Sequence, residues 1–139
     1  MSILEAIIYT IKNDATVQGL VGARVHADVL PEDSPKPALL AYVSTETAED
    51  CLTGFIGFDT ATIRVESTGL TRKSANETLQ AARMSLNGLQ GIVQGVPIQG
   101  VSQSTGIFHL SDKPNDATDR WQFRSVQSFD ISYHSFEGQ

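Results

Sequence analysis

The hydrophobic residues near the start of the chain recur with the period of an α-helix. Ile3, Ile7 and Ile11 lie four residues apart, and Leu4 and Ile8 beside them widen the apolar stripe. Ser2 and Glu5 have the spacing of a capping box, which marks the beginning of a helix. We therefore expect a helix over residues 3–12 with its apolar stripe on the core, followed by a short apolar turn over residues 19–22.

A second helical pattern lies in "GLTRKSANETLQAARMSLNG", residues 69–88. Ser74 and Glu77 repeat the capping-box spacing, and Gly88 stands where a helix commonly ends. The apolar positions fall on one face and are Ala75, Leu79, Ala82 and Leu86. The small alanines on this face predict close packing of the helix on a sheet.

Between and after these helices, hydrophobic and polar residues alternate with the period of β-strands. The clearest example is "TATIRVES", in which Ala61, Ile63 and Val65 alternate with polar residues. The same reasoning predicts strands over residues 24–29, 38–45, 60–67, 96–104 and 121–136. Helices and strands in this order predict an α+β fold, a mainly antiparallel sheet with two helices packed on one face.

The segments between the predicted elements are polar, acidic or rich in glycine and proline. "LPEDSPKPALLAYVS", residues 30–44, contains three prolines, but its irregular part is short enough for a loop within one domain. We therefore expect a single domain over residues 1–139. Residues 46–59 and residues 105–120 are expected to be long loops, and the first of them a mobile one.

Composition narrows the classes of function. The chain carries ten Lys and Arg against sixteen Asp and Glu, a net charge of −6, and it has no run of basic residues. Proteins that grip DNA neutralise phosphates with cations, so we expect no such grip here. The sequence contains no apolar stretch of membrane-spanning length and no signal-peptide pattern at its start, which predicts a soluble intracellular protein without a membrane partner.

Candidate catalytic groups are scattered. His26, His109 and His134 lie far apart in sequence, and Cys51 is the only cysteine, with no basic neighbour to lower its pKa. The acidic residues between positions 46 and 59 do not have the spacing of a calcium-binding loop. We therefore expect no catalytic residues, no cofactor and no metal site, and hence not an enzyme.

The ordered set of segments resembles the tail-completion, or tail-terminator, proteins of long-tailed bacteriophages and prophages. The resemblance covers nearly the whole chain. It rests on the N-terminal helix followed by "LVGARVHADVLPEDSPKPALLAYVS", on "TATIRVES", on the helix that ends in "LNGLQG", on "GVPIQG" and on the long aromatic strand at the C-terminus. Each motif is weak alone, and the order in which they occur carries the likeness.

The resemblance implies a structural virion protein without catalysis. Such a protein forms a homo-oligomeric ring, usually a hexamer, which caps the tail tube and joins it to the head connector. Its expected partners are other copies of itself, the tail-tube protein and the head-connector or adaptor protein. DNA would pass through the channel without specific binding, and a net negative charge suits such a channel. The implied location is the virion tail, assembled in the cytoplasm of the bacterial host.

Two groups of residues are candidates for these contacts. Phe55, Ile56 and Phe58 are large apolar residues in a segment expected to be a loop, so we expect them, with Phe108 of the second loop, at a subunit or tail-tube interface. The alternative for Phe55, Ile56 and Phe58 is that they fold back on the protein's own core. Glu46, Glu49 and Asp50 form the densest acidic cluster, and we expect them on the channel side.

Two alternatives remain open at this point. One is a head-closure or adaptor ring protein of the same particle, which gene neighbours would distinguish. The other belongs to a different class, a small ligand-binding or enzymatic α+β domain, which a tight pocket or an activity of the purified monomer would favour. The sequence fixes neither the ring size, nor the face that meets head or tail, nor the host.

Overall fold

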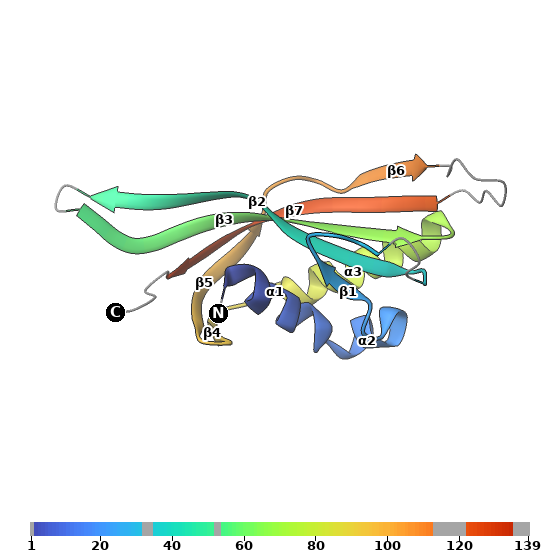
Figure 1. Ribbon diagram of the computed structural model, residues 1–139, viewed down its shortest axis with the longest axis horizontal. Coiled ribbons are helices and arrows are strands. Elements are labelled where there is room, and N and C mark those ends of the chain that lie inside the picture. The colour runs from blue at the N-terminus through green and yellow to red at the C-terminus, as the bar shows by residue number, and fades with distance from the viewer. Residues whose placement is uncertain (1, 32–34, 52–53, 113–121, 135–139) are drawn as a thin grey trace.

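The computed structural model describes residues 2–31, 35–51, 54–112 and 122–134, and for residues 47–51, 54–58 and 112 it describes the backbone alone. Helices and strands follow one another along this part of the chain (Figure 1). They are α1 (Ile3–Lys12), α2 (Ala15–Val21), β1 (Val25–Ala27), β2 (Ala38–Cys51), β3 (Gly54–Gly69), α3 (Arg72–Leu86), β4 (Gly91–Val93), β5 (Val96–Gln103), β6 (Phe108–Asp112) and β7 (Gln122–His134).

The strands form one sheet in the order β1-β2-β3-β7-β5-β4, and β6 also pairs with β7. β1 runs parallel to β2, whereas the other pairings are antiparallel. β5 pairs with the C-terminal half of β7 and β6 with its N-terminal half, so the two strands share one edge of β7. The helices lie together on one side of the sheet, which curls around them where β5 and β4 lie (Figure 1).

The prediction of a sheet covered by helices is confirmed, but the expected number of two helices is wrong. Residues 15–21 form α2, where a turn was predicted. Asp14 caps this helix, because its carboxylate accepts hydrogen bonds from the backbone of Thr16 at 3.0 Å and Val17 at 3.1 Å. Val17 and Val21, four residues apart, are buried, and their burial outweighs the low helix propensity of Gly19.

The first predicted helix is confirmed over residues 3–12. Ser2 is its N-cap and accepts a hydrogen bond from the Glu5 backbone at 3.1 Å. The later helix is also confirmed, but its predicted cap is wrong. Thr71 is the N-cap of α3 and accepts from the Ser74 backbone at 3.0 Å, so Ser74 lies inside the first turn.

The largest correction concerns residues 46–59, which were predicted to be a loop. Residues 46–51 and 54–59 belong to strands, and Glu46 pairs with Ala61 and Asp50 with Phe55 in an antiparallel hairpin. Threonines and aromatic residues in this segment favour strands, and ladder hydrogen bonds need no alternation of hydrophobic side chains. The hairpin extends beyond the helical part of the molecule (Figure 1).

The second predicted loop, residues 105–120, is partly a strand. Residues 108–112 form β6 along the edge of β7, and residues 113–120 lie outside the described residues.

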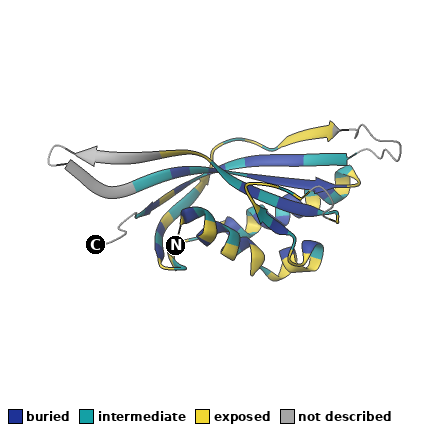
Figure 2. Ribbon diagram, viewed as in Figure 1, coloured by how far each residue is buried: buried dark blue, intermediate teal, exposed yellow. Residues whose placement is uncertain are grey.

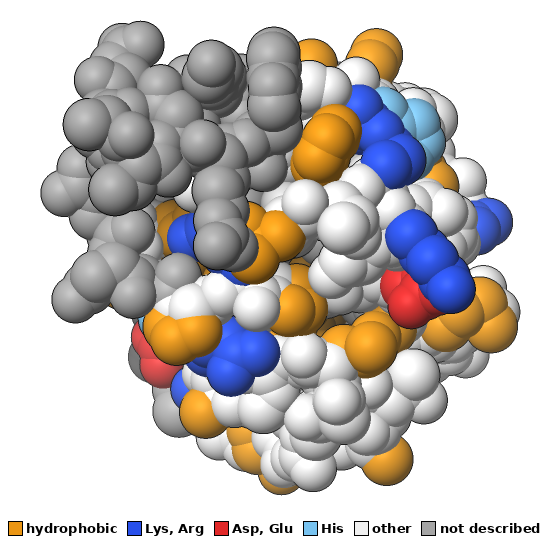
Figure 3. Space-filling model, turned by 90° about the vertical axis from the view of Figure 1, so that its right-hand side faces the viewer, with side chains coloured by type: hydrophobic (Ala, Val, Ile, Leu, Met, Phe, Trp, Pro, Cys, Tyr) orange, Lys and Arg blue, Asp and Glu red, His pale blue; other side chains and the backbone are white. Residues whose placement is uncertain are grey.

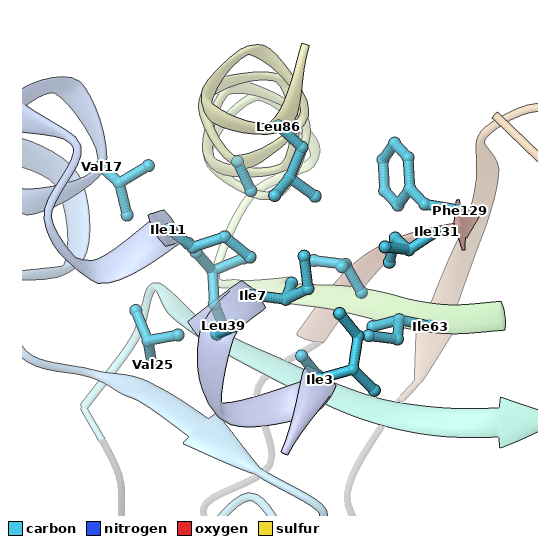
Figure 4. Close-up of a cluster of buried hydrophobic side chains, with 14 of the residues drawn as sticks. Ile3, Ile7, Ile11, Val17, Val25, Leu39, Ile63, Leu86, Phe129 and Ile131 are labelled. Carbon is cyan, nitrogen blue, oxygen red and sulfur yellow. The ribbon is translucent and has the colours of Figure 1, made fainter. Parts of the chain in front are cut away.

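The hydrophobic core lies between the helices and the sheet (Figure 4). Ile7 and Ile11 of α1 and Leu86 of α3 meet Ile63 of β3 and Phe129 of β7, and all five side chains are almost fully buried. Burial is concentrated on the faces that the helices and the sheet turn toward one another, whereas residues 108–111 of β6 are exposed (Figure 2).

Candidate functional site

The structure brings most of the predicted contact residues together on one hairpin. Glu46 is exposed on β2, and Glu49 and Asp50 follow it along the same strand toward the turn. Phe55, Ile56 and Phe58 lie on β3, the opposite strand of the hairpin. Apart from Glu46, the side chains of these six residues lie outside the described part of the structure. Both groups were expected in one loop over residues 46–59, whereas the structure places them on the two strands of a hairpin.

The remaining candidate, Phe108, does not join them. It is the first residue of β6, it is 57% exposed, and its partner across the ladder is Val126. The hairpin meets the other end of β7, where Phe58 pairs with His134. The contact candidates therefore belong to two separate surfaces, the hairpin and the β6 edge.

The β6 edge is held in place by Arg72 at the beginning of α3. Its guanidinium Nη2 donates to the Ser111 hydroxyl at 2.8 Å, and its Nη1 reaches the carbonyl oxygen of Leu110 at 3.3 Å and that of Arg124 at 3.5 Å. The guanidinium also lies over the Phe123 ring. Sequence reasoning missed Arg72 and β6, although the alternation of apolar and polar residues in "FHLSD" is a weak strand signal.

A charged network ties together the strands on the sheet face away from the helices. Ile63 and Val65 point into the core, so Arg64 and Glu66, which alternate with them, point to the opposite face. The Glu66 carboxylate is nearly buried and lies 3.2 Å from the Arg124 guanidinium and 3.6 Å from that of Arg64.

Tyr42 completes this network from β2. Burial of the Tyr42 hydroxyl raises its pKa, and the nearby charge of Glu66 and a hydrogen bond to Glu66 raise it further. The positive charges of Arg64 and Arg124 act in the opposite direction. The network therefore links β2, β3 and β7 through side chains as well as through backbone pairing.

The histidines do not form a catalytic centre. His109 Nδ1 lies 3.0 Å from the Ser125 hydroxyl, a distance that suits a base and a nucleophile, but Ser125 is fully buried and cannot meet a substrate. His26 lies on β1, and His134 lies 3.3 Å from Gln99 at the other end of β7. Among the described residues, no three His, Cys, Asp or Glu side chains gather as metal ligands.

Two of the hollows on the helical side border α3. One, of about 800 Å³, runs between α2 and α3 and is lined by Leu20, Ala81 and Met84 among others. The other, of about 390 Å³, lies between the end of α3 and β5, where Arg83 and Gln103 face it. No helix in the described part of the chain has the length and apolar character needed to cross a membrane.

The sequence matches the family model described as Tail completion protein gp17 over residues 5–131, nearly the whole chain. The chain belongs to the tail completion protein gp17 family. It is therefore a structural protein of a phage tail, as the resemblance in its sequence indicated.

The fold of this chain is similar to that of solved structures. One of them is a chain from the "Virion of native gene transfer agent (GTA) particle", which is 14% identical, covers 96% of both chains and aligns with a TM-score of 0.67. A second solved structure, 12% identical over 96% of this chain and 99% of that one, aligns with a TM-score of 0.44, too low to support an argument. No curated protein matches the sequence.

Proposed function

We propose that the protein forms a closed homo-oligomeric ring, a hexamer, that caps the tail tube and joins it to the head connector. In this proposal the whole chain, residues 1–139, acts as one domain and performs no catalysis. The observation that carries the proposal is the match to the tail completion family over residues 5–131. The similar fold of a chain from a virion particle supports it.

The arrangement of surfaces supports a ring in physical terms. The hairpin and the β6 edge lie at opposite ends of the long axis of the molecule (Figure 1). A protein with two different contact surfaces binds its copies head to tail, and such contacts close into a ring when the rotation between subunits allows it. Closure saturates all contacts, which is what the end of a polymer such as a tail tube requires.

The net charge of −6 suits a channel for DNA, because an acidic lumen repels phosphates. Glu46, Glu49 and Asp50 are the proposed channel-side residues. Phe55, Ile56, Phe58 and Phe108 are the proposed interface residues toward neighbouring subunits or the tail-tube protein. The proposed location is the neck end of the virion tail, after assembly in the host cytoplasm.

Native mass spectrometry of the purified protein, alone and with its tail-tube protein, tests the ring. We expect a species of six times the 15.0 kDa monomer, seen as a ring by negative-stain electron microscopy. A protein that stays at 15.0 kDa under both conditions would falsify the proposal. Binding to the head connector in the absence of any affinity for the tail tube would favour the head-closure role instead.

A further inference from the structure

β6 leaves one side of its backbone unpaired. It pairs with β7 on one side, and no described residue pairs with its other side. Phe108 is 57% exposed and Leu110 is 37% exposed, so hydrophobic side chains accompany this free edge. Natural proteins protect free edges with lysine, proline or a bulge, and residues 108–111 contain none of these.

The contacts of Arg72 show which backbone groups of β6 point outward. Its guanidinium reaches the carbonyl oxygens of both Leu110 and Arg124, so these two oxygens lie between β6 and β7. In an antiparallel ladder, successive residues turn their backbone groups to opposite sides. His109 and Ser111 therefore direct their N–H and C=O groups away from β7, to the side on which no described strand pairs with β6.

β2 has a second free edge. β1 pairs with the outer side of β2 only from Leu39 to Ala41. One further hydrogen bond on this side joins the Asp28 N–H to the Ala41 carbonyl at 3.0 Å. Beyond that point no described strand pairs with the outer side of β2. The Ser44 hydroxyl donates to the Thr62 carbonyl, which places the backbone groups of Thr62 on the β2 side of β3. The next pair, Glu46 with Ala61, therefore turns the backbone groups of Glu46 outward.

The two free edges have compatible directions. β2, β3, β7 and β6 run antiparallel in turn, so β2 and β6 are antiparallel to each other within one chain. When a second copy with the same orientation brings its β2 beside β6, the pairing is antiparallel and the sheet continues from one copy to the next.

The charges of the two edges also complement each other. Glu46 is exposed at the β2 edge. At the β6 end, Arg72 lies beneath the strand, and Lys and Arg side chains are prominent among the described residues of the face in Figure 3. A second copy of this chain presents a β2 edge that matches the β6 edge both in strand direction and in charge.

We propose that neighbouring copies join by strand addition, with the outer edge of β6 in one copy pairing with the outer edge of β2 in the next, in the segment that contains Glu46. This inference rests on the proposed ring and assigns its subunit contact. Backbone hydrogen bonds supply the pairing, and the exposed side chains of Phe108 and Leu110 become covered by the neighbouring strand. The contact is heterologous, so each copy uses a different edge toward each neighbour.

Two proline variants each remove a backbone hydrogen-bond donor from one of the two free edges. His109→Pro removes an outward N–H of β6, and Glu46→Pro removes one of β2, while the ladder bonds to β7 and β3 stay in place. His109→Ala and Glu46→Ala are the matched controls, because they remove the side chain and keep the N–H. Native mass spectrometry should show each proline variant as a monomer of 15.0 kDa, whereas both alanine variants should still assemble, because they keep the backbone N–H that pairs.

Mixing the two proline variants gives the sharper result. Glu46→Pro keeps a working β6 edge and His109→Pro keeps a working β2 edge, so the mixture should form a dimer that cannot grow. The mixture is measured at concentrations well above those at which the wild type assembles.

A mixture that stays monomeric overturns the inference. So does dimerisation of Glu46→Pro alone, which indicates symmetric pairing of β6 with itself. An intact ring in His109→Pro that has lost its tail-tube protein also overturns it, because the edge then serves that partner.

Amide hydrogen exchange of the wild type gives an answer that needs no variant to fold. The amides of His109 and Ser111 should exchange fast in the monomer and slowly in the assembly, while the Leu110 amide is protected in both. Equal exchange of His109 and Ser111 in a ring that forms normally overturns strand addition and leaves the ring in place. A wild type that never assembles, with or without the tail-tube protein, overturns the ring itself, and the contact fails with it.

Discussion

The guanidinium carbon of Arg72 lies 5.0 Å from the centroid of the Phe123 ring. The same side chain donates to the Ser111 hydroxyl at 2.8 Å and reaches the carbonyl of Leu110 at 3.3 Å. One residue in the first turn of α3 therefore joins the helix to β7 and to the edge strand β6. The core contributes little to holding β6, because residues 108–111 of the strand are exposed. Its order depends on the ladder with β7 and on this one cation.

Replacing Arg72 by alanine should loosen β6. The charged hydrogen bonds and the cation–π contact are partly exposed, so we expect a loss of about 1–2 kcal/mol in the free energy of unfolding. Amide exchange should accelerate in residues 108–112 more than elsewhere. The matched control is Lys73→Ala, whose side chain is 83% exposed and 3.8 Å from Glu77. Such a surface pair contributes at most about 0.5 kcal/mol. Equal losses in both variants would contradict an anchoring role for Arg72.

The Glu66 network predicts a response to alkaline pH. The pKa of Tyr42 is raised in the folded protein, first by burial and then by Glu66. The folded state therefore holds this proton more tightly than the unfolded chain. The resulting stability is fully present below pH 10.0, the ordinary value, and is lost as the pH rises through the higher folded value.

Tyr42→Phe should remove this part of the pH dependence. Denaturant unfolding of the wild type between pH 9 and pH 11, a window of about one unit on either side of the ordinary tyrosine value, should show a steeper fall in unfolding free energy than in the variant. Glu66→Gln should lower the pKa of Tyr42, because the negative charge that raises it is gone. Identical slopes in the wild type and Tyr42→Phe would show that Tyr42 is not the group responsible.

The elements that could be predicted from the sequence are those that bury one face. The helix over residues 3–12 and the strand around Ile63 could be predicted from hydrophobic periods, because each buries one face in the core and therefore carries apolar residues at regular spacing. α2 was missed because two glycines looked like turn residues, although Asp14 is a capping residue with buried valines at helical spacing after it.

The hairpin of β2 and β3 and the edge strand β6 could not be predicted from hydrophobic periods. Residues 46–58 show no regular alternation of apolar and polar residues, and β6 shows only the weak alternation of "FHLSD". Backbone pairing holds them instead, and it is nearly independent of side-chain pattern. The candidate site depends on the same long-range pairings. Arg72 and Ser111 are 39 residues apart, and nothing local to either residue indicates their contact.

Gly69 at the end of β3 should not tolerate a side chain. A Cβ atom there would lie 2.9 Å from the backbone nitrogen of Ala75 and 3.1 Å from the Ser74 hydroxyl, at the beginning of α3. Because backbone must move to make room, we expect Gly69→Ala to cost about 1–3 kcal/mol in thermal or denaturant unfolding. Gly19→Ala is the control. No atom lies within 4 Å of its added Cβ, and alanine in a helix should stabilise by about 0.5–1 kcal/mol. A neutral Gly69→Ala would show that α3 does not pack closely on this strand.

The aromatic residues of the hairpin should matter for assembly more than for folding. Phe55 and Phe58 lie on β3, where the hairpin extends beyond the helical part of the molecule (Figure 1). If they contact a neighbour or the tail tube, replacing both by serine should weaken assembly and leave monomer melting within about 0.5 kcal/mol of the wild type. Phe129→Ser is the contrast, because that side chain is 2% exposed in the core and its loss should unfold or strongly destabilise the monomer. A similar loss of monomer stability in the hairpin variant would place these aromatics on their own core.

The acidic residues of the hairpin should govern the passage of DNA. Changing Glu46, Glu49 and Asp50 together to lysine reverses three charges on one strand and keeps the backbone groups that pair. If these side chains line the channel, DNA ejection from the particles that assemble should slow because the lysines attract phosphates. The effect should weaken as salt concentration rises, since salt competes for both partners.

Replacing the same three residues by Gln, Gln and Asn separates attraction from lost repulsion. Neutral side chains cannot hold phosphates, so ejection from these particles should be close to wild type at moderate salt, and only the lysine variant should be strongly slowed. Particle yield is measured alongside, because a drop in yield with normal ejection from the remaining particles would assign the acids to subunit contact. Ejection that is unchanged in the lysine variant removes these three residues from the channel, since reversed charges in a narrow lumen cannot leave a passing polyanion unaffected.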